Sequence, residues 1–209
     1  MLGFETIGNA KVIAYDGAPI IATDPWLGDP AYFGSWALPF EIPEAQRKAI
    51  FDAQFIWCSH GHPDHLNPVS IEKLHGKNIL LPDHVGNRIR DTLRDAGYAV
   101  TVMPDGEWMQ LSDNIRALCI SDYFQDAVLL IDVGGTLLVN LNDASDRGWG
   151  RKLKRLIRGA DRSFLLKLFG YSVTDMMNFF DDDGNRIGPY TAPIGRSENK
   201  SRFMPTCSA

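Results

Sequence analysis

A short segment of the chain concentrates side chains that bind metal ions. Three of the five histidines and one aspartate lie within six residues, at His60, His62, Asp64 and His65. Imidazole and carboxylate groups at this density are typical of metal sites and unusual as core packing. His60 and His62 are two residues apart, so in an extended segment both rings point to one side and can hold one ion. Asp64 and His65 follow a turn at Pro63 and can face a second ion; the alternative is a histidine-rich loop without a metal.

Short apolar strands are expected to hold this loop in place. The apolar run 55–58 predicts a buried strand with the histidines after its C-terminal end, where open sheets tend to place their sites. Residues 4–15 predict a strand pair that turns near Gly8 and Asn9. Further strands are expected over 19–23, 54–58, 78–81, 100–103, 115–120, 127–132, 136–140 and 164–169, and helices over 43–52, 67–74, 87–96 and 149–158. This succession indicates a mixed α/β fold of packed layers.

Length and composition narrow the class of protein further. The 209 residues suit one domain over 1–180, followed by a loosely ordered tail over 181–209. A net charge of -5 gives no basic footprint for nucleic acid, and the basic run 151–158 is better explained as one face of an amphipathic helix. No apolar stretch has the length of a membrane span or the form of a signal peptide. We therefore expect a cytoplasmic protein that acts on a small-molecule substrate, without nucleic acid or membrane partners. Assembly of the chain into a homo-oligomer is left open.

The three cysteines do not form a metal-binding or disulfide framework. Cys58, Cys119 and Cys207 are odd in number and far apart, and no Cys-x-x-Cys unit is present. Cys58 and Cys119 lie in apolar runs, so buried thiols are expected at both positions. The histidine loop is therefore the main candidate for chemistry.

The pattern His60-x-His62-x-Asp64-His65 resembles the signature loop of the metallo-β-lactamase superfamily. The resemblance implies a metallo-β-lactamase-like αββα sandwich that holds one or two divalent metal ions. It also implies an aspartate that bridges the metals after a later strand, which Asp143 fits; the alternative for Asp143 is a turn or helix-capping role. A further aspartate after an early strand, here Asp24, orients a ligand from beneath the metals in such proteins. Because Asp-Pro commonly begins a turn, a purely structural Asp24 remains the alternative.

Two departures from the superfamily pattern affect the choice of metal. The histidine expected about twenty residues before the bridging aspartate is absent, and Asp122 is our candidate for the substituted ligand. A carboxylate in place of imidazole shifts preference from zinc toward iron or manganese. The histidine that such proteins supply near the C-terminus is also absent, so a single ion instead of two remains open. Zinc is the first expectation, with iron and manganese as alternatives.

Other motifs are similar to one branch of the superfamily. The segments 23–27, 62–66 and 140–143, together with Trp36, resemble the metallo-β-lactamase-like domain of CMP-N-acetylneuraminate hydroxylase. They also resemble related hydrolases of the phospholipase D and ascorbate-6-phosphate lactonase type. The hydroxylase carries Cys-x-His and Cys-x-x-His pairs for a Rieske cluster, and this sequence has neither. An oxygenase activity here would therefore need electrons from a separate protein.

Three functions are compatible with these residues. The leading hypothesis is a metal-dependent hydrolase that uses a metal-activated water, with Asp64 accepting or orienting its proton. An iron-dependent oxygenase of the hydroxylase type is the alternative, and a catalytically decayed binding protein of the same fold is the third. In the loop after the early strand, aromatic residues either wall the substrate site or anchor the loop: Trp26, Tyr32, Phe33 and Trp36.

Overall fold

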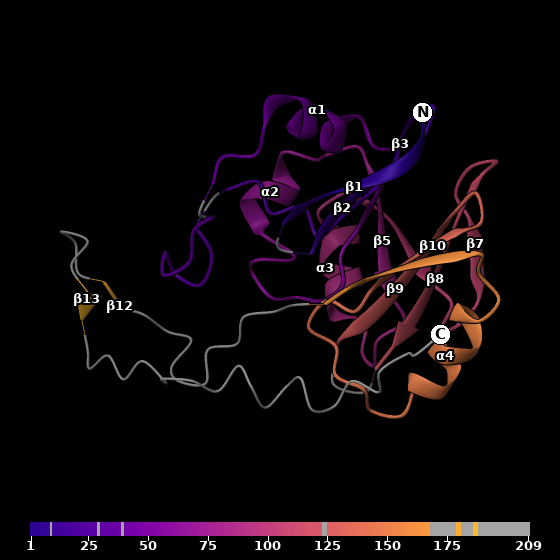
Figure 1. Ribbon diagram of the computed structural model, residues 1–209. Coiled ribbons are helices and arrows are strands. Elements are labelled where there is room, and N and C mark those ends of the chain that lie inside the picture. Colours follow the sequence, from indigo (N-terminus) through magenta and orange to yellow (C-terminus); the bar gives the residue numbers. More distant parts are fainter. Residues whose placement is uncertain are drawn as a thin grey trace.

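Two β-sheets pack face to face, and helices cover their outer faces (Figure 1). The computed structural model describes residues 1–8, 10–28, 30–38, 40–122 and 125–167, and the backbone of 179–180 and 186–187. The layers form the predicted αββα sandwich. The tail expected over 181–209 lies outside the described residues, except for the backbone of 186–187. Within the described part of the chain, no helix is long and apolar enough to cross a membrane.

The first sheet contains six strands in sequence order. They are β1 (Leu2–Gly8), β2 (Lys11–Asp16), β3 (Ala18–Thr23), β4 (Phe55–Trp57), β5 (Asn78–Pro82) and β6 (Ala99–Met103). The strands from β1 to β3 pair antiparallel, and those from β3 to β6 pair parallel. The helices α1 (Glu44–Asp52), α2 (Pro68–Glu72) and α3 (Arg88–Asp95) connect the parallel strands. Ile50, Ile71 and Leu93 of these helices pack in one cluster on the sheet, so they cover its outer face.

The second sheet is built from the later part of the chain. Its strands are β7 (Trp108–Gln110), β8 (Ile115–Ser121), β9 (Ala127–Val133), β10 (Thr136–Asn140) and β11 (Arg162–Leu166), in the order β11-β10-β9-β8-β7. Between the parallel strands β10 and β11 the chain passes through α4 (Gly150–Ile157), which packs Leu153 on the outer face. A separate short pair joins β12 (Phe179–Phe180) and β13 (Arg186–Ile187). The late strand was predicted over 164–169; β11 covers 162–166, residues 168–169 of the prediction lie outside the described residues, and β7 was not predicted.

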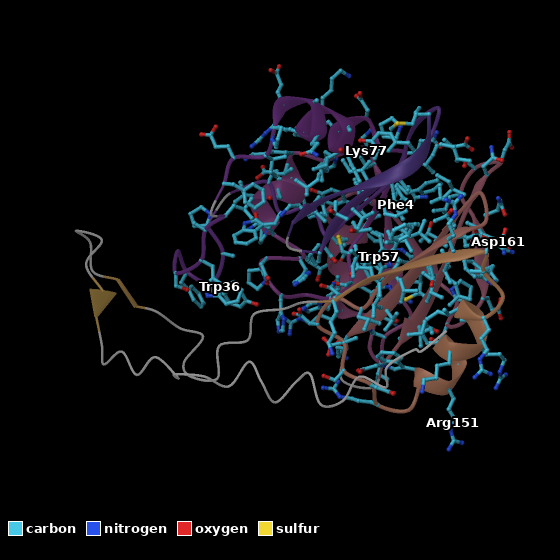
Figure 2. All side chains as sticks on the ribbon, viewed as in Figure 1. Phe4, Trp36, Trp57, Lys77, Arg151 and Asp161 are labelled. Carbon is cyan, nitrogen blue, oxygen red and sulfur yellow. The ribbon has the colours of Figure 1, made fainter. Side chains whose placement is uncertain are left out.

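The alternation of side chains along each strand produces separate cores. On β8, Ala117 and Cys119 face the first sheet, whereas Leu118 and Ile120 face α4. Trp57 of β4 fills the space between the sheets and is fully buried (Figure 2). Cys58 and Cys119 are buried free thiols, as predicted. Because both faces of the central strands are packed, their burial fixes where the strands end and where the polar loops after them begin.

Candidate metal centre

Loops that follow three strands meet at one edge of the sandwich. The strands β3 and β4 pair in parallel, with Thr23 opposite Trp57, so Asp24 and Ser59 follow them at the same edge. The backbone N–H of Asp24 donates to the carbonyl of Trp57 at 2.7 Å, which extends this pairing by one residue. Asn142 follows β10 in the opposite sheet and also contacts Asp24. The site is therefore built across both layers of the sandwich.

Three side chains after these strands converge on one point. Donor atoms of His60, His65 and Asp143 all lie within 4.8 Å of one another. The Oδ2 atom of Asp143 is 3.6 Å from Nε2 of His60 and 3.5 Å from Nε2 of His65. The Oδ2 atom of Asp64 is 3.2 Å from the same nitrogen of His65. Two imidazoles and two carboxylates thus face a common volume.

His62 meets this group from the solvent side. Its Nδ1 atom lies 2.7 Å from Nε2 of His60, and the two rings are 4.4 Å apart. His62 is exposed, whereas His60 and His65 are buried. The two-residue spacing therefore brings both rings to one side of the chain, as predicted. A role for His62 as a ligand remains a prediction.

Asp24 anchors the two buried histidines from beneath. Its Oδ1 atom accepts hydrogen bonds from the backbone N–H of Ser59 at 2.8 Å and from the Ser59 hydroxyl at 2.9 Å. Its Oδ2 atom accepts from Nδ2 of Asn142 at 2.8 Å and lies 3.4 Å from Nδ1 of His65. Nδ1 of His60 is 2.9 Å from the Ser59 oxygen. Because the Ser59 hydroxyl donates to Asp24, its oxygen acts as an acceptor, for Nδ2 of Asn142 and for an N–H at Nδ1 of His60.

This network fits a metal ion. The Nε2 atoms of His60 and His65 face Asp143. Nδ1 of His60 faces Ser59, and Nδ1 of His65 faces Asp24. Such a hydrogen bond places the proton on Nδ1 and leaves the Nε2 lone pair for a metal, the usual arrangement of a ligating histidine. Imidazole nitrogen and carboxylate oxygen are also ligand types that zinc and iron accept. The residues present therefore suit a divalent ion.

The electrostatics of the group favour a bound cation. Burial lowers the pKa of His60 to about 4, and the neighbouring His65 and His62 add to this effect. Burial opposes charge on His65, but Asp24, Asp143 and Asp64 outweigh it and raise the pKa of His65 well above its usual value. Burial works against the Asp64 carboxylate, yet hydrogen bonding and charge from His65 lower its pKa to about 2. The carboxylates thus attract a cation to the position that Nε2 of His60, which is uncharged at neutral pH, also faces.

Backbone conformation at the support residues is also unusual. Asp24 and Asn142 have φ values of 42° and 50°, in the left-handed region. Asp and Asn tolerate this region better than most residues because their short polar side chains bond locally. Asp24 lies directly after β3 and Asn142 two residues after β10, where the chain turns to direct these side chains into the site. The contact between Asn142 and Asp24 was not predicted from the sequence. Two asparagines close together, Asn140 and Asn142, were the available signal for a turn here.

Asp122 occupies a different environment from the one expected of a ligand. It follows β8 and is buried, but it is not in the group formed by His60, His65 and Asp143. Nη1 of Arg147 lies 3.2 Å from its Oδ1 atom and 2.9 Å from its Oδ2 atom. The sequence analysis did not predict a role for Arg147. Its position four residues after Asp143 was the available sign that it lies near the site. Ligation by Asp122 remains a prediction.

The aromatic loop after β3 is anchored at Trp26 and contacts the histidine cluster through Tyr32, and a role in walling the substrate site remains a prediction. Trp26 is buried and anchors the loop, and Tyr32 packs edge-on against Trp36 at 4.8 Å. The Tyr32 hydroxyl donates to Oδ1 of Asp64 at 2.9 Å, so this ring reaches the cluster directly. Phe33 is fully exposed, and Trp36 lies at the periphery of the molecule (Figure 2). The loop is therefore anchored at its start and contacts the site at its middle.

A cavity of about 650 Å³ opens beside the cluster, between the histidine loop and α3. His60, Gly61, His84 and Arg88 belong to its lining. Its size is in the range of small-molecule sites. Nε2 of His84 lies 3.0 Å from the carbonyl oxygen of Asp126, so His84 is both hydrogen-bonded and at the rim of the site.

The two sheets with helices on their outer faces form a metallo-β-lactamase-like fold, with the histidine cluster at one edge. Solved structures agree: an isothiocyanate hydrolase from Delia radicum gut bacteria superposes with a TM-score of 0.55 at 14% identity, covering 73% of this chain and 67% of that one. CmlA, a diiron β-hydroxylase from Streptomyces venezuelae, superposes with a TM-score of 0.54 at 16% identity, covering 72% of this chain and 32% of that one. The chain has this fold, and its resemblance to the superfamily is confirmed.

Sequence comparison leads to a more particular relative. Cytidine monophosphate-N-acetylneuraminic acid hydroxylase of Danio rerio is 26% identical over 199 residues, which cover 87% of this chain. The match covers 34% of that relative, so the chain spans about a third of its length. No protein-family model matches the sequence. The relative is thus named as a hydroxylase, and the structural neighbours include a hydrolase and a diiron hydroxylase.

Proposed function

We propose that this protein is a metal-dependent hydrolase of a small-molecule substrate, with His60, His62, His65 and Asp143 as the principal metal ligands. The observation that carries the proposal is the convergence of His60, His65 and Asp143 within 4.8 Å beside a cavity of about 650 Å³. A divalent ion held there would acidify a water molecule and polarise the substrate oxygen. Zinc, iron and manganese all suit this ligand set, and Asp122 would join it if Arg147 released its carboxylate.

The protein groups around the cluster have separable tasks in this reaction. Asp64 has a pKa of about 2, so it is ionised at neutral pH and would orient a water molecule by accepting a hydrogen bond from it, although so low a pKa makes it a weak base. The Tyr32 hydroxyl holds Oδ1 of Asp64, which leaves Oδ2 directed toward His65. Asp24 and Ser59 fix the rings of His60 and His65, so the ligands are oriented before any ion arrives. The cavity lined by His60 receives the substrate, and Arg88 in its lining favours a substrate with an anionic group.

Metal analysis combined with a ligand variant tests this proposal. Protein purified without added metal is expected to contain at least one divalent ion per chain and to hydrolyse members of a panel of activated esters and phosphodiesters under anaerobic conditions. His62→Ala should lose both metal and hydrolysis, whereas His75→Ala should lose neither, because His75 is exposed and stacks on Tyr98. Full metal content in His62→Ala would refute the ligand assignment.

An iron-dependent oxygenase is the second candidate. It is supported by the hydroxylase relative, by the CmlA neighbour and by the carboxylate at Asp122 in place of an imidazole. Such an enzyme would receive electrons from a separate protein. Oxygen uptake by the iron-loaded protein with a chemical reductant, together with no anaerobic hydrolysis, would favour this candidate. Protein that binds only zinc and never iron would count against it.

A further inference from the structure

A lysine ammonium group is buried beneath the candidate metal centre. Lys11 is the first residue of β2 and is 2% exposed. Its Nζ atom has no hydrogen-bond partner among the residues that the structure describes. An unpaired buried ammonium is costly, because neither water nor a protein acceptor replaces its hydration. The position of Lys11 therefore calls for an explanation beyond packing.

The start of β2 is held in place by the strand ends that build the site. The Thr23 hydroxyl donates to the carbonyl of Ala10 at 2.7 Å, and Nδ2 of Asn140 donates to the same oxygen at 3.2 Å. Thr23 Oγ1 also accepts from the backbone N–H of Val12 at 2.9 Å. These bonds on either side of Lys11 tie it to the ends of β3 and β10, directly before Asp24 and Asn142.

The groups around the Lys11 ammonium belong to the centre. Its Nζ atom lies 5.8 Å from the ring centroid of Trp26, within the range of a cation–π contact. The carboxylates of Asp24 and Asp64 lie within electrostatic reach. Burial lowers the pKa of Lys11 to about 8, and these two carboxylates oppose that effect, so the side chain is still largely protonated at pH 7. A fixed positive charge is thus present beside groups that would take up a metal cation.

We propose that Lys11 is a resident cation of the metal centre, which offsets the charge of Asp24 and Asp64 and weakens the binding of a divalent ion there. The effect should be strongest for a second ion, because Asp64 is expected to bind that ion. Removal of the ammonium should relieve its repulsion of a metal cation, and metal binding should become tighter.

The proposal rests on the proposed metal centre and extends it. A unit charge and a divalent ion at a partly buried site interact strongly enough to change affinity on the order of tenfold or more. Lys11→Met keeps the length and apolar stem of the side chain while removing the charge. Lys11→Gln removes the same charge and keeps a polar end, as a second variant if methionine is not accommodated. Lys154→Met is the matched control, because Lys154 is exposed on α4.

Zinc titration of the metal-free full chain against a chromophoric chelator at pH 7, with elemental analysis after equilibrium dialysis, tests the proposal. Both Lys11 variants should bind zinc at least about tenfold more tightly than the wild type or take up an additional ion, and Lys154→Met should stay within about twofold. Unchanged binding in a folded Lys11 variant would overturn the inference. Failure of both variants to fold would overturn it too, because the ammonium would then stabilise the fold.

The same titration separates this inference from the proposed function. Zinc binding to the wild type with no change in the Lys11 variants would refute the role of Lys11 and leave the metal centre intact. Zinc binding to the Lys11 variants but not to the wild type would support the role of Lys11 and refute the metalloenzyme. Absence of zinc binding in every form would refute both.

Discussion

Replacing Asp24 by asparagine should weaken both the fold and the binding of metal. Asp24 is fully buried, and its Oδ2 atom meets Nδ2 of Asn142 at 2.8 Å and Nδ1 of His65 at 3.4 Å. An asparagine can keep an oxygen toward Ser59, but it then turns an amide NH2 group toward two donors. Asparagine tolerates the φ of 42° at this position, so the change alters charge and acceptors without a new backbone strain.

The size of this effect follows from the donors that lose their acceptor. Each buried donor left unpaired costs about 1–3 kcal/mol, so Asp24→Asn should lower the free energy of unfolding of the metal-free protein by about 3 kcal/mol. Loss of a group that orients a ligand typically weakens metal binding by about 10–100-fold. Urea unfolding followed by circular dichroism measures the first quantity, and chelator competition measures the second.

A surface aspartate provides the control for this experiment. Asp52 pairs with Lys48 one turn earlier on α1, and its side chain is 48% exposed. Exposed pairs of this kind contribute at most about 1 kcal/mol, so Asp52→Asn should change stability little and metal affinity not at all. Asp24→Asn with a stability loss below about 0.5 kcal/mol and unchanged metal affinity would refute the supporting role of Asp24.

Three other results are expected. Tyr32→Phe should keep its metal but hydrolyse substrate on the order of tenfold more slowly, because Asp64 loses the bond that orients it; an unchanged kcat would contradict this. The raised pKa of His65 gives the metal-free fold stability that is complete below pH 6.5 and is lost as pH rises through the folded pKa. Urea unfolding should show this decline in the wild type and a smaller one in His65→Gln. Burial raises the pKa of both Cys58 and Cys119, the latter to about 12, so mass spectrometry should find them unmodified by a thiol reagent until urea unfolds the protein.

The sequence predicted the strands that are mostly buried. The strands β3, β4, β9 and β10 are apolar on both faces, and short apolar runs bounded by turns mark such strands clearly. The strand β7 was missed because Trp108, Met109 and Gln110 are at most half-buried and lie at a sheet edge. The end of β11 was misplaced for a similar reason, since four of its five residues are exposed.

The candidate site was predictable where its residues are adjacent in sequence. His60, His62 and His65 come together because one loop carries all three, and the resemblance to a known superfamily added Asp143. The supporting contacts are between distant residues: Asn142 reaches Asp24 across 118 positions, and no local pattern reports such a pairing. Lys11 was overlooked for a different reason, because a lysine at the start of a strand is ordinarily solvated.

The buried carboxylates in and near the candidate centre obtain their partners in different ways. A buried carboxylate needs a cation or several donors, because its desolvation is otherwise too costly. Asp24 has Ser59 and Asn142, whereas Asp122 has the guanidinium of Arg147. Arg147 also lies 3.4 Å from Asp126, whose pKa is raised by burial and by the charges of Asp122 and Asp143.

The Asp122 carboxylate is therefore neutralised by the guanidinium of Arg147. An imidazole at this position would have no negative charge to neutralise and could bind a metal or a proton. The same reasoning applies to Lys11 beneath Asp24 and Asp64. Both basic side chains lower the net negative charge that a metal would otherwise neutralise. We therefore expect a centre with two built-in cations beside His60, His65 and Asp143 to suit one divalent ion better than two.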